Sequence, residues 1–279
     1  MNSIRIGEKL LSLDNPIVMG ILNVTSDSFF DGGMYTDFGH ACAQIEQMIG
    51  EGAKIIDIGG FSSNPNSKLI STEEEINRIE PIVEEVFKRF PDIILSIDTF
   101  SGEVVDRMSQ YGQFIVNDIS GFAYDDNLIP TVARLNLPYV LMHMRGRPET
   151  MTQLANYDDV VLEVFTDLMN KSKTLKSKGV NQIIIDPGFG FAKKISHNYQ
   201  LLRNLEVFGT IGLPLLAGIS RKSMIYKTLG ITPGEALNGT TALHMIALMK
   251  GAKILRVHDV SEAVETIKLW HVYSNNVND

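Results

Sequence analysis

The stretch QIIIDPG, residues 182–188, shows the pattern that decides the fold. It begins as the run Gln182–Ile185, in which three isoleucines follow the glutamine, and Asp186, Pro187 and Gly188 come next. A short, continuous run of β-branched residues bounded by turn-forming residues is typical of a strand buried on both faces, as in a parallel sheet.

The same pattern recurs along the chain. The other apolar runs are Ile17–Leu22, Lys54–Ile58, Ile93–Ile97, Gln113–Val116, Tyr139–Met142, Leu213–Ala217 and Lys253–Val257. Amphipathic stretches with helical spacing lie between the runs, among them Phe38–Glu51, a helix capped by Ser71, Val160–Gly179, Ala236–Lys250 and Ser261–Tyr273. Eight strand–helix units in 279 residues leave about 35 residues for each, the size of one βα repeat. The sequence therefore predicts the α/β class and a single (β/α)8 barrel domain over residues 1–279.

A doubly wound open sheet is the alternative fold, because it shows the same alternation of strands and helices. Its dinucleotide-binding form is disfavoured, since no G-x-G-x-x-G follows an early strand. The polar residues at the strand ends, described below, favour the barrel.

Composition and charge exclude several classes of protein. Apolar residues make up 44% of the chain and charged residues 21%, which is typical of globular proteins and excludes disorder. Lysine and arginine total 25 against 33 acidic residues, a net charge of −8 that disfavours binding to nucleic acid. Cys42 is the single cysteine, as expected in a reducing compartment. No apolar run is long enough to span a membrane, so we expect a cytoplasmic protein that binds no membrane.

Each of the eight predicted strands runs into polar or ionisable residues. A single such residue is more often a helix cap or a turn former than a functional group. In a barrel, however, the carboxyl ends of all strands meet at one face, where the active site lies. The residues concerned include Asn23, Asp57, Asp98, Asn117, His143, Asp186, Ser220 and Arg256. Together they predict the mouth of an active site.

The charges divide this predicted mouth into two sides. Asp98, Asn117 and Asp186 offer hydrogen-bond acceptors, which suit a flat heterocycle with adjacent N–H donors, such as a 2-amino-4-oxo-pyrimidine edge. Arg256 and His258 are two residues apart on the last strand and therefore face the same way, as a site for a phosphate-like anion would require.

A second anion-binding signal lies in Gly218–Ser223, where Ser-Arg-Lys-Ser directly precedes an apolar helix start. Lys222 lies on this site, which favours a contact with ligand over an ordinary solvated charge. The long segments Thr25–Tyr35 and Phe61–Leu69 are typical of lids or binding loops. Phe29 and Phe30 are candidates either to cover an aromatic substrate or to pack against the barrel rim.

Nine short motifs, in a fixed order, carry a resemblance to a known family. They are GILNVTSDSFFDGG from Gly20, DIGG from Asp57, SIDTF from Ser96, VNDISG from Val116, MHMRGRPETM from Met142, IIDPGFGF from Ile184, GISRKS from Gly218, LNGTTAL from Leu237 and LRVHDV from Leu255. Over essentially its full length the chain resembles the dihydropteroate synthases, which are pterin-binding TIM barrels.

The resemblance implies a reaction and a role for each matching residue. The reaction condenses (7,8-dihydropterin-6-yl)methyl diphosphate with para-aminobenzoate, giving 7,8-dihydropteroate and diphosphate in folate biosynthesis. By the family pattern Asp98, Asn117, Asp186 and Lys222 hold the pterin, and Arg256 and His258 hold the diphosphate. Asn23 would ligate Mg²⁺, Ser223 would receive the aminobenzoate carboxylate, and Ser63 would supply the hydroxyl of the second lid. The family also implies a homodimer and a sulfonamide target.

The second lid departs from the family pattern at Phe61, Asn64 and Asn66, and Asn64 removes a cation expected near anionic substrate groups. This departure keeps a non-catalytic pterin-binding homologue open as an alternative. A second alternative is a methyltetrahydrofolate-dependent methyltransferase, which resembles the same barrel. The anion site at Ser220–Ser223 and the pair Arg256 and His258 favour the synthase.

Overall fold

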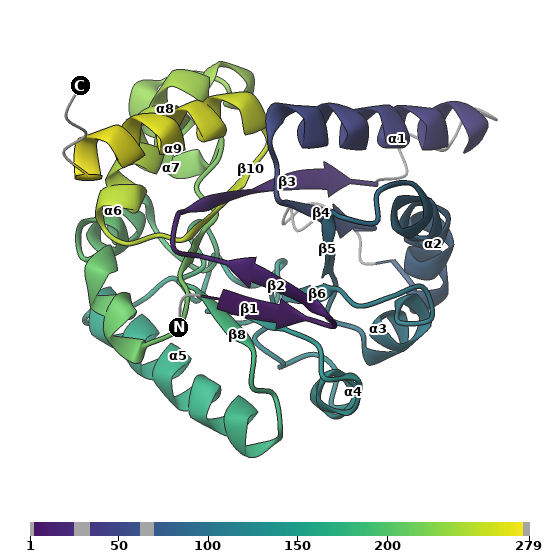
Figure 1. The fold of residues 1–279 in the computed structure, drawn as a ribbon. Helices are drawn as coiled ribbons and strands as arrows, with labels where there is room; N and C mark the ends of the chain where they lie inside the picture. Colours follow the sequence, from purple (N-terminus) through teal and green to yellow (C-terminus); the bar gives the residue numbers. More distant parts are fainter. Residues whose placement is uncertain (1–2, 25–33, 62–69, 276–279) are drawn as a thin grey trace.

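The computed structural model describes residues 3–24, 34–61 and 70–275, and it confirms the predicted barrel. Eight parallel strands lie in the order β8-β7-β6-β5-β4-β3-β10-β9, so the strands follow their order in the sequence and the last strand, β10, pairs with the first barrel strand, β3. A bridge between Ile185 and Leu215 joins the two ends of this order and closes the barrel. The helices surround the strands in Figure 1. The open-sheet alternative is therefore wrong.

The strands and helices follow the predicted order. The strands are β1 Ser3–Ile6, β2 Lys9–Ser12, β3 Ile17–Asn23, β4 Ile55–Gly59, β5 Ile94–Asp98, β6 Ile115–Asp118, β7 Tyr139–Met142, β8 Ile183–Asp186, β9 Leu216–Ala217 and β10 Ile254–Val257. The α-helices are α1 Met34–Glu51, α2 Thr72–Arg89, α3 Gly102–Met108, α4 Leu128–Leu135, α5 Val160–Ser177, α6 Ile195–Arg203, α7 Ser223–Leu229, α8 Leu237–Met249 and α9 Val260–Asn275.

Several predicted boundaries need correction. The helix α1 begins at Met34 rather than Phe38, because no residue in the preceding turn breaks a helix. The run Leu213–Ala217 forms only a two-residue strand, and Ile115–Asp118 starts and ends two residues after the predicted run. The predicted cap is confirmed, since the Ser71 hydroxyl accepts a hydrogen bond from the Glu74 backbone N–H at 3.1 Å.

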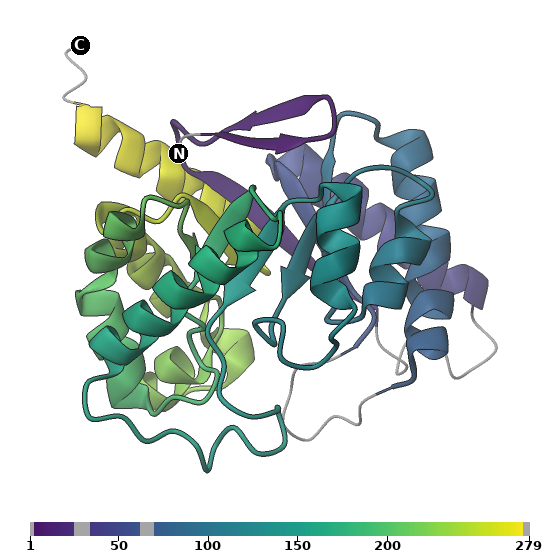
Figure 2. The ribbon, with the colours of Figure 1, turned by 90° about the horizontal axis from the view of Figure 1, so that it is seen from below.

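The sequence analysis missed the antiparallel hairpin formed by β1 and β2. Its buried residues pack against a layer with one apolar side chain from each barrel strand. The cluster consists of Ile4, Ile6, Leu11, Leu13, Met19, Ile55, Ile94, Ile115, Val140, Ile184, Leu216 and Ile254. Figure 2 shows the hairpin across one end of the barrel and the long loops at the opposite end. The hairpin closes the amino-terminal end, so any site in the barrel opens at the carboxyl-terminal end.

Most of the remaining apolar side chains lie between the strands and the helices that cover them. This core includes two buried residues of β4 and four of α2, namely Ile56, Ile58, Ile79, Ile82, Val83 and Val86. Cys42 of α1 is buried as well. Within the described ranges, no helix is both long and apolar enough to cross a membrane.

Candidate active site

A cavity of about 420 Å³ opens at the carboxyl-terminal end of the barrel strands. Six of the predicted site residues line it together, and they are Asn23, Asp98, Lys222, Ser223, Arg256 and His258. Asn117 lies beside Asp98 in the register of β5 and β6, and Asp186 ends β8. The predicted residues Ser63, Phe29 and Phe30, and the lid positions Asn64 and Asn66, lie outside the described residues.

Asp57 accepts hydrogen bonds from two of the predicted site residues, although the sequence analysis gave it no role in binding. Its side chain is completely buried, and its Oδ2 accepts hydrogen bonds from Asn117 Nδ2 at 2.9 Å and from Arg256 Nε at 2.6 Å. The available signal was a carboxylate inside the apolar run Lys54–Ile58. Because the Asn117 amide donates to Asp57, its oxygen is left as the acceptor for a ligand.

The sequence analysis predicted Arg256 on the anion-binding side of the mouth, apart from the acceptor residues. In the structure, Arg256 contacts one of those acceptors, Asp98. Its guanidinium binds two carboxylates, with Nε at 2.6 Å from Asp57 Oδ2 and Nη2 at 2.7 Å from Asp98 Oδ2. The two sides of the mouth are therefore linked by an ion pair. A partly buried guanidinium that contacts two buried carboxylates is held in one orientation before any anion arrives.

The carboxylates of Asp98 and Asp186 are buried, and that of Asp98 is partly unpaired. Asp98 Oδ1 has no hydrogen-bond partner among the described residues, and burial raises the pKa of Asp98 while Arg256 lowers it. Asp186 Oδ1 accepts from the Gly188 N–H at 2.7 Å. Burial raises the pKa of Asp186 as well, and Lys222 opposes that rise. Buried carboxylate oxygens without a protein donor are ready acceptors for ligand N–H groups.

Lys222 lies against the loop that follows β8. Its Nζ donates to the Phe189 carbonyl oxygen and lies 4.5 Å from the centre of the Phe191 ring. Burial lowers the pKa of Lys222 to about 8, although Asp186 favours the ammonium form. The lysine is thus a cation at neutral pH that loses its proton readily.

Two glycines make this close packing feasible. Gly188 has φ +71°, and a side-chain Cβ there would lie 2.2 Å from the His143 carbonyl oxygen. Gly190 has φ +83°, and a Cβ there would lie 3.1 Å from Lys222 Cδ. Both positions combine a left-handed backbone with close contact, so only glycine fits without strain.

Lys193 is a further buried group that the sequence analysis did not single out. Its Nζ lies 2.9 Å from the carbonyl oxygens of Gly188 and Phe191 and 3.0 Å from His143 Nδ1. Burial, assisted by the Lys222 charge, lowers the pKa of Lys193 well below its usual range. Lys193 therefore stabilises, through two hydrogen bonds to backbone carbonyls, the loop against which Lys222 packs.

Replacement of Lys193 by methionine is expected to weaken pterin binding without unfolding the barrel. The change leaves the two loop carbonyls without their donor, a cost of about 1–3 kcal/mol, and it loosens the loop around Lys222. Titration calorimetry with a dihydropterin measures the loss, and Lys194→Met at the exposed neighbouring position is the control. Equal affinities in the two variants would contradict the role assigned to Lys193.

The tautomer of His258 follows from its contacts with Ser220. The Ser220 hydroxyl oxygen accepts from the His258 backbone N–H at 3.2 Å, and we assign its proton to the contact with His258 Nδ1 at 3.0 Å, an arrangement in which the hydroxyl both accepts and donates. The Nε2 atom then carries the imidazole proton. Desolvation and the nearby Arg256 lower the pKa of His258 to about 4, which favours the neutral ring with one N–H donor.

Arg221 fixes the segment that carries Ser220 and Lys222. Its guanidinium binds Asp259 through two hydrogen bonds, of 2.8 Å from Nε and 2.7 Å from Nη2, and its backbone has φ +53°. A two-point arginine–carboxylate pair is rigid, and it compensates for the strained backbone. Arg221 therefore orients the segment.

The chemistry at Asn23 fits a magnesium ion that is held mainly by a substrate. Asn23 ends β3, lines the cavity, and makes no side-chain hydrogen bond to any described residue. In the described ranges no three His, Cys, Asp or Glu side chains form a metal-binding group. Mg²⁺ usually takes one or two protein oxygens together with phosphate oxygens and water, which one free amide oxygen allows.

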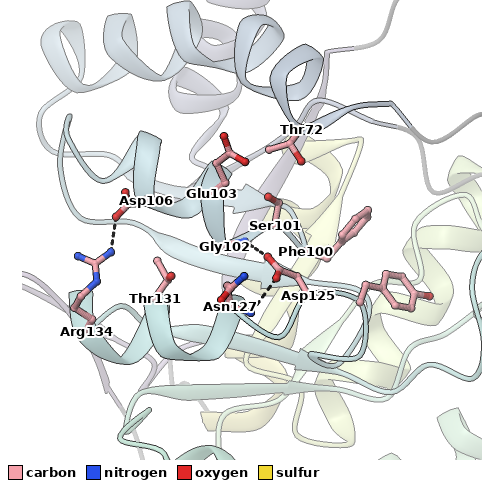
Figure 3. Close-up of a pocket in the computed structure, with 11 residues that line it drawn as sticks. Thr72, Phe100, Ser101, Gly102, Glu103, Asp106, Asp125, Asn127, Thr131 and Arg134 are labelled. Atoms are coloured by element: carbon pink, nitrogen blue, oxygen red, sulfur yellow. Dashed lines mark hydrogen bonds and ion pairs between the residues drawn. The ribbon is translucent and has the colours of Figure 1, made fainter.

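A larger cavity of about 680 Å³ lies beside the loops after β5 and β6 (Figure 3). It contains none of the predicted site residues, and two of its three acidic residues, Asp106 and Asp125, are already paired. Asp125 accepts from the backbone N–H groups of Gly102 and Asn127, and Asp106 forms an ion pair with Arg134. The functional groups gather in the smaller cavity.

Comparisons with known proteins identify the family of the chain. The model of the pterin-binding enzyme family matches residues 19–258. Dihydropteroate synthase of Escherichia coli is 43% identical over 261 residues, which cover 93% of this chain and 92% of the relative. The chain belongs to the dihydropteroate synthase family.

Solved structures of this family have the same fold. A dihydropteroate synthase of Xanthomonas albilineans, solved with 4-aminobenzoic acid, superimposes with a TM-score of 0.91 at 37% identity, covering 98% of both chains. A dihydropteroate synthase of Yersinia pestis, solved with a sulfonamide drug, gives a TM-score of 0.91 at 38% identity, covering 98% of this chain and 99% of that one. The predicted family and barrel fold are confirmed.

Proposed function

We propose that this chain joins (7,8-dihydropterin-6-yl)methyl diphosphate to para-aminobenzoate, releasing diphosphate. The observation that carries the proposal is that one cavity holds an unpaired carboxylate oxygen, Asp98 Oδ1, beside the donors of Lys222, Arg256 and His258. A pterin edge offers N–H donors and its diphosphate offers acceptors, so the two ends of this substrate match the two kinds of group. The E. coli and X. albilineans relatives support the same reaction.

The proposed reaction proceeds by loss of diphosphate followed by attack of the arylamine. The C–O bond to the pterin methylene breaks and its electron pair leaves with the diphosphate, which Arg256 and the His258 Nε2–H stabilise. The carboxylates of Asp98 and Asp186 favour the positive charge that spreads over the pterin. The arylamine nitrogen then forms the new N–C bond and loses a proton to solvent, and positioning of the two reactants supplies much of the acceleration.

We propose Mg²⁺ as the cofactor, with Asn23 as its protein ligand. When bound to the diphosphate, the ion would add positive charge to the leaving group. Ser223 would contact the arylamine carboxylate at the end of the cavity that is formed by α7.

Release of diphosphate from the pterin substrate tests the proposal. We expect release that depends on para-aminobenzoate and is matched by formation of dihydropteroate. Pterin binding without turnover at saturating arylamine would favour the non-catalytic alternative. Demethylation of methyltetrahydrofolate, with no diphosphate released, would favour the methyltransferase.

His258→Ala should weaken binding of the diphosphate substrate by roughly tenfold or more, because a hydrogen bond to a charged group is worth about 1.5–3 kcal/mol. It should leave the affinity for the corresponding pterin alcohol unchanged, since the alcohol carries no anion. Competition binding with both ligands measures the two effects. Equal losses for both ligands would mean that His258 only supports the structure.

We also propose that the protein acts as a homodimer in the cytoplasm. Large apolar side chains are exposed on the neighbouring helices α8 and α9, namely Ile246, Met249, Leu269 and Val272. Burial of such side chains against a second copy would stabilise the assembly. Light scattering of the purified protein, and of Leu269→Glu as the disrupting variant, tests the dimer.

A further inference from the structure

Tyr226 lines the same cavity as Ser223 and Lys222, yet neither the motifs nor the proposed reaction gives it a role. It follows Ser223 by three residues on α7. Residues three apart lie on the same face of a helix, one turn from each other. Tyr226 therefore stands next to the end of the cavity at which Ser223 lies.

The Tyr226 side chain is partly buried, and its ring packs against the main core. Its hydroxyl makes no hydrogen bond to any residue in the described ranges. The neighbouring Tyr199 is different, because its hydroxyl donates to the Met224 carbonyl oxygen at 3.0 Å and is committed to the structure. A phenol that lines a cavity with a free O–H is a donor available to a ligand.

The walls of the cavity indicate what this ligand is. Apolar surface in the cavity comes from Phe61, Met151 and the half-buried Phe191. These three side chains belong to one apolar cluster at the mouth of the barrel. An aromatic ring fits against such a wall. A ligand with a flat ring and a terminal acceptor would place the ring against these residues and the acceptor near α7.

We propose that Tyr226 is a specificity-determining residue for the arylamine substrate. Its hydroxyl donates a hydrogen bond to the carboxylate of para-aminobenzoate, and its ring closes the cavity beyond that carboxylate. The proposal rests on the proposed function, which places the carboxylate beside Ser223.

Two separate effects follow from the two parts of the side chain. The hydroxyl favours an ionised acceptor, because hydrogen bonds to charged groups are about twice as strong as neutral ones. The ring occupies the space that a substituent on the carboxyl group would need. An extended arylamine such as N-(4-aminobenzoyl)glutamate is then excluded by the bulk of the ring.

The test compares Tyr226→Phe and Tyr226→Ala with the unmodified protein, using para-aminobenzoate and N-(4-aminobenzoyl)glutamate as substrates. Tyr226→Phe should raise the KM for para-aminobenzoate roughly tenfold and leave kcat unchanged, since only a binding contact is lost. Tyr226→Ala should also raise the kcat/KM ratio of the extended arylamine to para-aminobenzoate at least about tenfold. Tyr111→Phe, which removes a hydroxyl bonded to Glu80 on α2, should leave both constants unchanged.

Each contrary result has a separate meaning. Both variants keeping the original KM and the original preference would overturn the role of Tyr226 while leaving the reaction in place. An unmodified protein that turns over neither arylamine would overturn the proposed function, and this inference with it. Thermal unfolding of the variants shows that each is folded before its constants are compared.

Discussion

Lys222→Met should lower the affinity for a dihydropterin by at least about 100-fold and leave the barrel folded. The change removes a charged donor worth about 1.5–3 kcal/mol, and about 1.4 kcal/mol corresponds to a factor of ten. It also removes the cation that opposes the rise in the pKa of the buried Asp186 carboxyl. Asp186 then binds a proton more readily and becomes a poorer acceptor. Calorimetric titration with a dihydropterin measures the combined loss.

Lys227→Met, at an exposed position on the same helix, is the matched control. The pH dependence gives a second readout. Because the pKa of Lys222 is lowered to about 8, the ammonium is present below that pH and is lost above it. Pterin affinity should therefore fall as the pH rises through about 8 in the unmodified protein, and the weak residual affinity of Lys222→Met should not. Unchanged affinity in Lys222→Met would remove this lysine from the pterin site.

The sequence predicted the barrel well because the decisive signal is local. Strands such as Ile183–Asp186 are buried on both faces, so each is a continuous apolar run that ends in a polar residue. The hairpin β1–β2 was missed because its strands are only four residues long and half of their positions face outward. Its burial depends on the layer of strand residues beneath it, which are distant in the sequence.

The partners of the site residues could not be predicted in the same way. Polar residues at strand ends indicate that groups meet at one mouth, but they do not say which groups form pairs. Arg256 was expected to be free for an anion, whereas it is bound to Asp57 and Asp98 on β4 and β5. Lys193 is one of two adjacent lysines, and only the fold shows that it faces His143 while Lys194 is exposed.

Arg256→Met should lower the free energy of unfolding by about 3–5 kcal/mol, the usual cost of leaving a buried charge without its partner. Both carboxylates are buried, with side-chain exposures of 0% for Asp57 and 12% for Asp98. Arg107→Met is the control, because it breaks an ion pair with Glu80 in which the arginine side chain is 47% exposed. Such pairs contribute about 0–1 kcal/mol.

A second substitution, Asp57→Asn, separates the contribution of the Arg256 charge to stability from that of its side-chain packing. Asp57→Asn alone should destabilise the protein, since Arg256 loses a partner, but in the Arg256→Met background it should stabilise, because it removes an unpaired buried charge. Asn117 can still donate to the asparagine oxygen. Chemical denaturation of the four proteins gives the coupling energy, which we expect to exceed about 1.5 kcal/mol. Additive effects of the two substitutions would contradict the ion pair.

The pH dependence of the free energy of unfolding is a second test of the ion pair between Arg256 and Asp98. Arg256 lowers the pKa of Asp98, so its removal raises that pKa further in the folded protein. The folded Arg256→Met variant then binds more protons than its unfolded chain, and its stability falls as the pH rises. The deficit relative to the unmodified protein should be smaller at about pH 5 than at about pH 8. A deficit independent of pH would mean that the packing of the arginine side chain, and not its charge, stabilises the mouth of the barrel.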